Sequence, residues 1–238
     1  MRPVLTLLAA EICGGKPDAA LRVACALEFL HAASLVFDDL PCMDDAALRR
    51  GRPALHVAFG VDLATLAGLA LLNQAYLLFA LESPGLVRLA ALEVGTDGMI
   101  GGQAVDVEGL RTRSRLEKTT ALTRLTMAAG AIVAGAKPAE VSLLSSFGEA
   151  LGEAYQILDD VADAFGSESL LGKTAGQDAR HGRGSAAFQW GADGARERAT
   201  SLMTRSCAEL RDYFGPTEPV RVLEAFAGMV VAPQAMAA

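Results

Sequence analysis

Two clusters of aspartate residues carry most of the chemistry that this 238-residue chain could perform. The first is the run DDLPCMDD over residues 38–45, and the second is DDVAD over residues 159–163. Carboxylates set this close repel one another unless a cation lies between them. Oxygen-only ligand sets suit Mg²⁺, which keeps several waters and shares its coordination shell with substrate phosphates. The clusters therefore predict a site that holds a phosphate-bearing substrate through magnesium.

Basic residues follow both clusters along the chain. Arg49 and Arg50 come within five residues of the first cluster, and Lys173 lies ten residues beyond the second. Guanidinium and ammonium groups bind phosphate oxygens strongly. The alternative for the arginine pair is a pair of charges that satisfies a helix C-terminus. Acids and bases arranged together in this way indicate a pocket for a diphosphate.

Helical spacing would bring the candidate side chains onto common faces. Asp159 and Asp160 lie four and three residues before Asp163, so an α-helix presents all three carboxylates on neighbouring positions. A solvated acidic face has the same spacing, but apolar residues precede this cluster. His31 lies seven residues before Asp38 and so shares its face two turns earlier. This histidine is either a ligand-binding residue or a hydrogen-bonded core residue.

The composition favours helices and restricts the possible partners. The chain is 52% hydrophobic but only 5% aromatic, and alanine and leucine dominate it. Its net charge of −7 argues against a nucleic-acid partner. The four cysteines have no CxxC spacing and no basic-then-apolar signal sequence opens the chain, so we expect reduced thiols and a cytoplasmic protein.

The periodicity is helical nearly throughout, and no stretch alternates convincingly as a strand. Asp18 is a candidate cap for the helix that leads into the first cluster, and Pro41 must place that cluster at the helix end. Residues 166–194 are expected to form a long loop or flap, with Gly51 to Pro53 as a shorter loop. The remaining helices are expected at 3–13, 61–81, 85–101, 116–134, 139–165, 192–213 and 218–231.

The expected helix at 61–81 is apolar on all sides and raises the question of a membrane. It contains Asp62, Asn73 and Gln74 and is barely long enough to span a bilayer. A helix that is apolar all round is more often buried in a core or in a subunit interface. We therefore expect no stable membrane insertion.

Five segments, taken in chain order, resemble the motifs of one enzyme family. They are DDLPCMDD with the following LRRGRPALH, then GGQAVD, KTTAL, YQILDDVAD and LGKTAGQD. In these segments the chain resembles the trans-isoprenyl diphosphate synthases, which include the farnesyl and geranylgeranyl diphosphate synthases. The resemblance runs from Arg2 to about Gly184. It implies an all-α isoprenoid synthase bundle around a deep central cavity, with residues 1–238 as one domain and a homodimer as the usual assembly.

The resemblance also implies a role for each matched residue. Three Mg²⁺ ions per active site, which Mn²⁺ can replace, would be held by Asp38, Asp39, Asp44, Asp159, Asp160 and Asp163. The two diphosphates would be bound by Arg2, His31, Arg49, Arg50, Lys118, Gln156, Lys173 and Arg183. The implied catalytic set is Asp38, Asp39, Asp44, Lys118, Thr119, Gln156 and Asp159.

The implied reaction joins isopentenyl diphosphate to dimethylallyl, geranyl or farnesyl diphosphate by ionisation, condensation and elimination. In this family a bulky residue four or five positions before the first aspartate stops chain growth. Those positions hold Ser34 and Ala33, which are small, so we expect geranylgeranyl diphosphate, with farnesyl diphosphate as the alternative. Phe29 and Phe37 are the side chains that would change this expectation.

The sequence departs from the family pattern at its amino-terminal end, and this departure leaves other functional hypotheses open. The family pattern places Gly-Lys-Arg-Leu before Arg2-Pro3, whereas this sequence begins at Met1, so an amino-terminal helix and one lysine are expected to be missing. A weakly active or regulatory subunit of a partner synthase is therefore a second hypothesis. A terpene cyclase would require a mixed Asn/Ser/Glu metal motif, which residues 159–163 lack. A prenyl-carrier binding protein would not require paired aspartate clusters with adjacent arginines.

Overall fold

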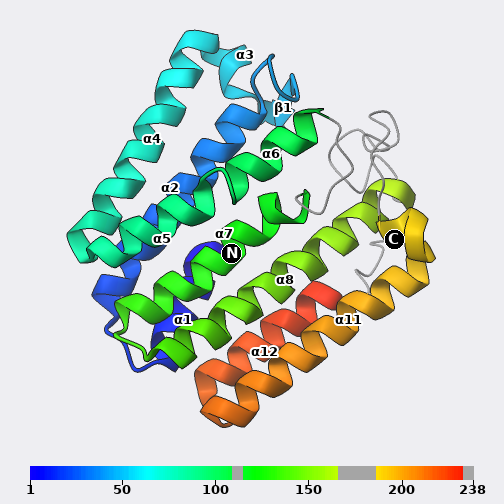
Figure 1. The fold of residues 1–238 in the computed structure, drawn as a ribbon. Coiled ribbons are helices and arrows are strands. Elements are labelled where there is room, and N and C mark those ends of the chain that lie inside the picture. Colours follow the sequence, from blue (N-terminus) through cyan, green and yellow to red (C-terminus); the bar gives the residue numbers. More distant parts are fainter. Residues whose placement is uncertain (109–114, 166–185, 233–238) are drawn as a thin grey trace.

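The chain folds into a bundle of helices with one small hairpin (Figure 1). The computed structural model describes the backbone of residues 1–108, 115–165 and 186–232, and the side chains of 1–105, 119–162, 164 and 190–232. Its elements are α1 (Arg2–Ile12), α2 (Pro17–Asp38), β1 (Leu48–Arg49), β2 (Arg52–Pro53), α3 (Leu55–Phe59), α4 (Val61–Glu82), α5 (Pro84–Val94), α6 (Met99–Glu108), α7 (Arg115–Val133), α8 (Pro138–Phe165), α11 (Ala186–Phe214) and α12 (Glu218–Val231).

The predicted all-α class is confirmed, and most helix bounds lie close to those expected. Three local expectations are wrong. Lys16, not Asp18, is the N-cap of α2, and Pro17 occupies its first turn. The helix expected at 85–101 is divided into α5 and α6, because the chain leaves helical geometry at Gly95. The loop expected at 51–53 contains a short strand that pairs with the residues before it.

Helix α7 separates two apolar clusters that form the core of the described residues. Met127 and Ala131 face a cluster made with α1, α8, α11 and α12. Leu122, Leu125 and Ala129 face a second cluster made with α2, α4 and α5. The two sets lie on opposite faces of one helix, as the 3.6-residue period dictates. Figure 1 shows the same order, with α7 and α8 between the α2–α4–α5 side and the α11–α12 side.

Helix α4 contributes one face to the core and leaves the other face exposed. Both α2 and α4 are long and apolar enough to cross a membrane by length and composition alone, but only 22% of the most apolar window of α4 is buried, against 39% for α2. Its buried residues are few, and its outward face exposes Leu63, Leu66, Leu69, Leu77 and Leu81. The inner face of α4 therefore belongs to the core, and burial of its outer face in a subunit interface stays a prediction.

Glycines allow α7 and α8 to approach closely. A Cβ atom at Gly148 would lie 2.5 Å from the carbonyl oxygen of Thr123 and 3.0 Å from the Cα of Arg124, both of which are backbone atoms. A backbone cannot rotate out of the way as a side chain can. The closeness of the two helices thus depends on the missing side chain.

We expect Gly148→Ala to destabilise the fold by about 1–3 kcal/mol, the usual cost of overpacking a core. Thermal and urea unfolding followed by circular dichroism would measure it. Gly228→Ala in α12 is the matched control, because a Cβ there meets nothing within 4 Å; its better helix propensity should leave stability unchanged or slightly raised. Equal effects of the two substitutions would contradict the close-packing argument.

Candidate active site

The first aspartate cluster lies where α2 ends, as Pro41 predicted. Asp38 is the last residue of α2 and Asp39 is its C-cap. The backbone then turns back on itself: the Asp44 N–H donates to the Asp38 carbonyl oxygen at 3.0 Å, and the Ala46 N–H donates to that of Asp39 at 3.3 Å. Asp44 is therefore returned to the neighbourhood of Asp38 despite the four residues between the acid pairs.

A two-stranded hairpin brings Arg49 onto Asp39. Strands β1 and β2 are antiparallel, and Arg50 and Gly51 form the turn with φ of 53° and 74°. Two successive positive φ values match the right-handed twist of a tight hairpin. Arg49 Nε lies 3.0 and 3.1 Å from the two carboxylate oxygens of Asp39, and a second guanidinium nitrogen bonds to Oδ1. This bonding raises the pKa of Arg49 above its ordinary value.

The ion pair accounts for the burial of Asp39. Only 4% of this residue is exposed, and a carboxylate that is removed from water needs a cation and hydrogen bonds to remain charged. Arg49 supplies both through a bidentate contact.

A second group of basic residues lies beside this pair: Arg2 of α1, His31 of α2 and Arg50 of the hairpin turn. Burial lowers the pKa of Arg2, Glu28 and Tyr155 act in the opposite direction, and Arg50 lowers it further. The Arg2 Nε is buried and has no hydrogen-bond partner among the described residues. Burial, followed by the charges of Arg2, Arg50 and Arg49, lowers the pKa of His31 to about 4. The structure thus brings together three predicted diphosphate ligands, Arg2, His31 and Arg50.

The second aspartate cluster lies in the last turns of α8 and is linked to α7. Thr119 Oγ1 donates to Gln156 Oε1 at 2.8 Å, and Gln156 Nε2 donates to Asp160 Oδ1 at 2.8 Å. Asp160 is only 7% exposed, whereas Asp159 is half-buried. Two residues of the implied catalytic set are therefore connected by hydrogen bonds to a predicted metal ligand.

Four predicted site residues lie outside the described side chains: Lys118, Asp163, Lys173 and Arg183. Their roles, and the shape of the central cavity that they would border, stay predictions.

The carboxylates do not form a ready-made metal cage. Among the described side chains, no three His, Cys, Asp or Glu residues are close enough to hold a metal ion together. The donor set nevertheless fits a hard divalent cation, because it offers carboxylate oxygens without sulfur, two of them from the buried residues Asp39 and Asp160. A cation that takes part of its shell from substrate phosphates does not require a complete protein cage.

Two contacts near the first cluster were not predicted. The side chain of His56 in α3 is only 8% exposed, and its Nε2 lies 3.9 Å from Asp45 Oδ1. Glu28 lies near enough to Arg2 to oppose the effect of burial on its pKa. The sequence held a signal for each, since His56 closes the matched LRRGRPALH segment and Glu28 precedes His31 by three residues on the same face of α2.

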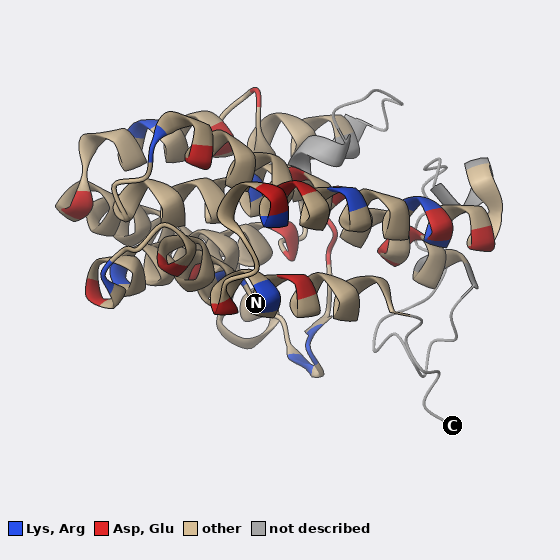
Figure 2. Cartoon of the chain, turned by 90° about the horizontal axis from the view of Figure 1, so that it is seen from below, with Lys and Arg blue, Asp and Glu red and all other residues tan. Residues whose placement is uncertain are grey.

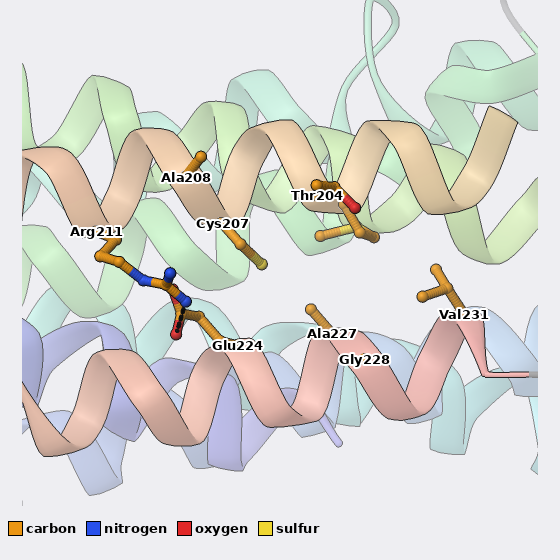
Figure 3. A pocket seen from close by; sticks show the side chains of 9 residues that line it. Thr204, Cys207, Ala208, Arg211, Glu224, Ala227, Gly228 and Val231 are labelled. Atoms are coloured by element: carbon orange, nitrogen blue, oxygen red, sulfur yellow. Dashed lines mark hydrogen bonds and ion pairs between the residues drawn. The ribbon is translucent and has the colours of Figure 1, made fainter. Parts of the chain in front are cut away.

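One groove among the described residues lies away from the predicted site. It has a volume of about 330 Å³ and runs between α11 and α12, past Cys207 and the Arg211–Glu224 ion pair (Figure 3). None of the predicted site residues lines it. Figure 2 shows basic and acidic segments interspersed along the helices in a view from below.

The comparisons with known proteins agree with the geometry of the site. The family model described as polyprenyl synthetase matches residues 1–210. The chain belongs to the polyprenyl synthetase family. This polyprenyl synthetase is 34% identical over 243 residues to a geranylgeranyl diphosphate synthase of Cyanophora paradoxa, covering 95% of this chain and 81% of that protein. It is 37% identical to the mitochondrial geranylgeranyl pyrophosphate synthase 6 of Arabidopsis thaliana, covering 90% and 70%.

A solved structure gives the same result for the fold. The apo FPP/GFPP synthase of Zymomonas mobilis superposes with a TM-score of 0.82 at 28% identity, covering 98% of this polyprenyl synthetase and 83% of that chain. The predicted family and enzyme class are confirmed: the chain is a prenyltransferase of the isoprenyl diphosphate synthase type. Its family uses divalent metal ions and acts on allylic and isopentenyl diphosphates.

The lowered pKa of His31 predicts how stability depends on pH. An unfolded histidine titrates near 6.5 and this one near 4, so between those values the unfolded state binds the extra proton. The free energy of unfolding should therefore fall as the pH is lowered from 6.5 to 4. Urea unfolding of the wild type and of His31→Gln across this range isolates the contribution, because all other groups are shared. Parallel curves for the two proteins would show that His31 does not contribute.

Proposed function

We propose that this synthase makes geranylgeranyl diphosphate by repeated condensation of isopentenyl diphosphate with an allylic diphosphate. The observation that supports the proposal is that two different candidate sites for a diphosphate lie beside each other, at the start of α1 and the end of α2. One consists of cations, with the buried, unpartnered Nε of Arg2 near Arg50 and His31. The other is the carboxylate cluster that ends α2, with Arg49 bonded to Asp39. Two substrates with diphosphate groups would require two such sites.

The cationic site suits isopentenyl diphosphate, whose diphosphate is retained in the reaction. Burial already holds Arg2 in place, so little side-chain freedom would be lost on binding. His31 is neutral near pH 7 because its pKa is lowered, and its ring can donate a hydrogen bond without adding charge. This site would orient the double bond of isopentenyl diphosphate towards the allylic carbon.

The carboxylate site suits the allylic substrate, whose diphosphate departs. Asp38, Asp39, Asp44, Asp159, Asp160 and Asp163 would hold magnesium, at three ions per site with manganese as a substitute. When bound, the ions would neutralise the departing diphosphate and so favour breakage of the allylic C–O bond. Arg49, with Lys118, Lys173 and Arg183, would contact the same phosphate oxygens.

The chain's own residues would then guide the carbon chemistry. Thr119 and Gln156 present oxygen dipoles that are fixed by their mutual hydrogen bond and by Asp160, and such fixed dipoles stabilise a developing allylic cation. The double bond of isopentenyl diphosphate attacks that cation and forms the new carbon–carbon bond. The proton lost in elimination passes to the released diphosphate, since no described side chain is placed as an obvious base.

The twenty-carbon product is supported by the small side chains below Asp38. Ala33 is 2% exposed, and the Ser34 hydroxyl bonds to the His31 carbonyl oxygen of its own helix at 2.9 Å. Neither side chain reaches outward from α2 to obstruct a growing chain. The two relatives named above are both called geranylgeranyl synthases, which agrees with this choice, whereas farnesyl diphosphate remains the alternative product.

The proposed assembly is a cytoplasmic homodimer. Five exposed leucines lie on one side of α4, with the polar residues Asn73 and Gln74 between Leu69 and Leu77, and a monomeric protein seldom leaves so many apolar side chains together in water. A second copy that presents the same face would bury both under two-fold symmetry. A regulatory role beside a partner synthase is the competing hypothesis, and the activity of the isolated chain decides between them.

We expect the purified 238-residue chain, given Mg²⁺, isopentenyl diphosphate and each of the five-, ten- and fifteen-carbon allylic diphosphates in turn, to form a twenty-carbon product. Mass spectrometry would read its length. Asp38→Ala combined with Asp39→Ala should abolish the product while leaving the fold intact by circular dichroism. Absence of product with every primer, from a folded protein that binds diphosphate, would instead support the regulatory hypothesis.

Ala33→Tyr should shorten the product. Ala33 is buried on the face of α2 that leads to Asp38, and a phenol ring there would fill the space into which the chain grows. The same assay measures the effect, with Ala33→Ser as a control of nearly unchanged size. An unchanged twenty-carbon product from a folded tyrosine variant would show that the cavity floor lies elsewhere.

A further inference from the structure

The far end of the Phe37 ring, on the residue before the first aspartate, lies against a glycine of α4. A Cβ atom at Gly68 would lie 2.7 Å from Cζ, 2.9 Å from Cε1 and 3.2 Å from Cε2 of Phe37. Three ring atoms thus occupy the space that any other residue at position 68 would need. Gly68 is buried and lies in the middle of α4. Glycine is a poorer helix former than alanine at such a position. Its presence there is therefore explained by packing.

Phe37 is the bulky side chain closest to the proposed cavity floor. Ala33 and Ser34 precede it by four and three residues and share its face of α2. Phe29, the other candidate, packs into the apolar cluster between α2, α4 and α5. Phe37 is half-buried near the end of its helix and directly precedes Asp38.

The arrangement of the helices fixes the direction in which this ring could move. Helix α4 lies on the outer side of α2 and exposes its own outward face, while α2 packs on its other sides against α1 and α7 (Figure 1). A ring pushed off Gly68 must therefore move away from α4 and towards the middle of the bundle. The far end of a phenylalanine side chain rotates readily, so the displacement need not unfold the protein.

We propose that Gly68 and Phe37 form a specificity-determining pair: the absence of a side chain at position 68 keeps the Phe37 ring seated on α4 and out of the path of the growing prenyl chain. This inference rests on the proposed chain-elongating function and adds residues to it. The pair belongs to two helices, so the permitted product length depends on α4 as well as on the residues of α2.

Gly68→Ala tests the pair with a single added carbon. We expect the ratio of fifteen- to twenty-carbon product to rise about tenfold, since a steric penalty of ordinary overpacking size corresponds to roughly that factor. Adding Phe37→Ala to Gly68→Ala should restore the twenty-carbon product by removing the displaced ring. Gly228→Ala, where a Cβ meets nothing within 4 Å, is the matched control and should leave the ratio unchanged.

A folded, active Gly68→Ala protein with an unchanged ratio would overturn the proposal, as would a shortened product that persists in the double variant. If Gly68→Ala does not fold, Phe37→Trp decides: a ring too large for the space above Gly68 must move towards the middle of the bundle and should shorten the product, and an unaltered product from a folded, active Phe37→Trp protein contradicts the pair. Size-exclusion chromatography checks that assembly is the same for all variants.

The failure of this pair and the failure of the proposed function give different results. An inactive wild type counts against the function alone. In that case calorimetric titration with geranyl and farnesyl diphosphate still tests the pair. Gly68→Ala should weaken binding of the longer ligand about tenfold relative to the shorter, and equal weakening of both would contradict the proposal.

Discussion

The charge on Asp39 is the constraint on which the rest of the site depends. A carboxylate that is 4% exposed remains charged only when a cation and hydrogen bonds replace the water it has lost. Arg49 meets that need, but only because the chain reverses at Arg50 and Gly51 and returns along the hairpin. The turn that orients Arg49 also places Arg50 close enough to lower the pKa of Arg2 and His31. One ion pair therefore arranges both anion sites.

The sequence predicted the helices well because their apolar spacing and their breakers are local signals. Pro41 correctly ended α2, and the helices expected at 116–134 and 139–165 correspond to α7 and α8. The hairpin was missed because two-residue strands have too few positions for an alternating pattern to be visible. Which face of α4 is buried could not be predicted, since composition records how apolar a helix is but not which of its faces has a neighbour.

The site was predictable as a set of residues but not as a set of contacts. Local spacing put Asp159 and Asp160 on one helix, and the resemblance added Thr119 and Gln156. The chain of bonds from Thr119 through Gln156 to Asp160 joins residues 37 positions apart, so it follows from the packing of α7 on α8, which no local pattern reveals. The same is true of Phe37 on Gly68, which appears only when α2 and α4 are placed side by side.

Helix α7 gives the bundle a property that neither aspartate cluster suggests. The first cluster is carried by α2 on one side of this helix, and the second by α8 on the other, and each carrier belongs to a different apolar cluster. The two apolar clusters pack on opposite faces of α7, so neither apolar cluster can keep its packing without that helix. The two aspartate clusters therefore do not mark two independent halves of the bundle. The carboxylates that must act together are supported from separate cores, and a single shared helix ties their positions together.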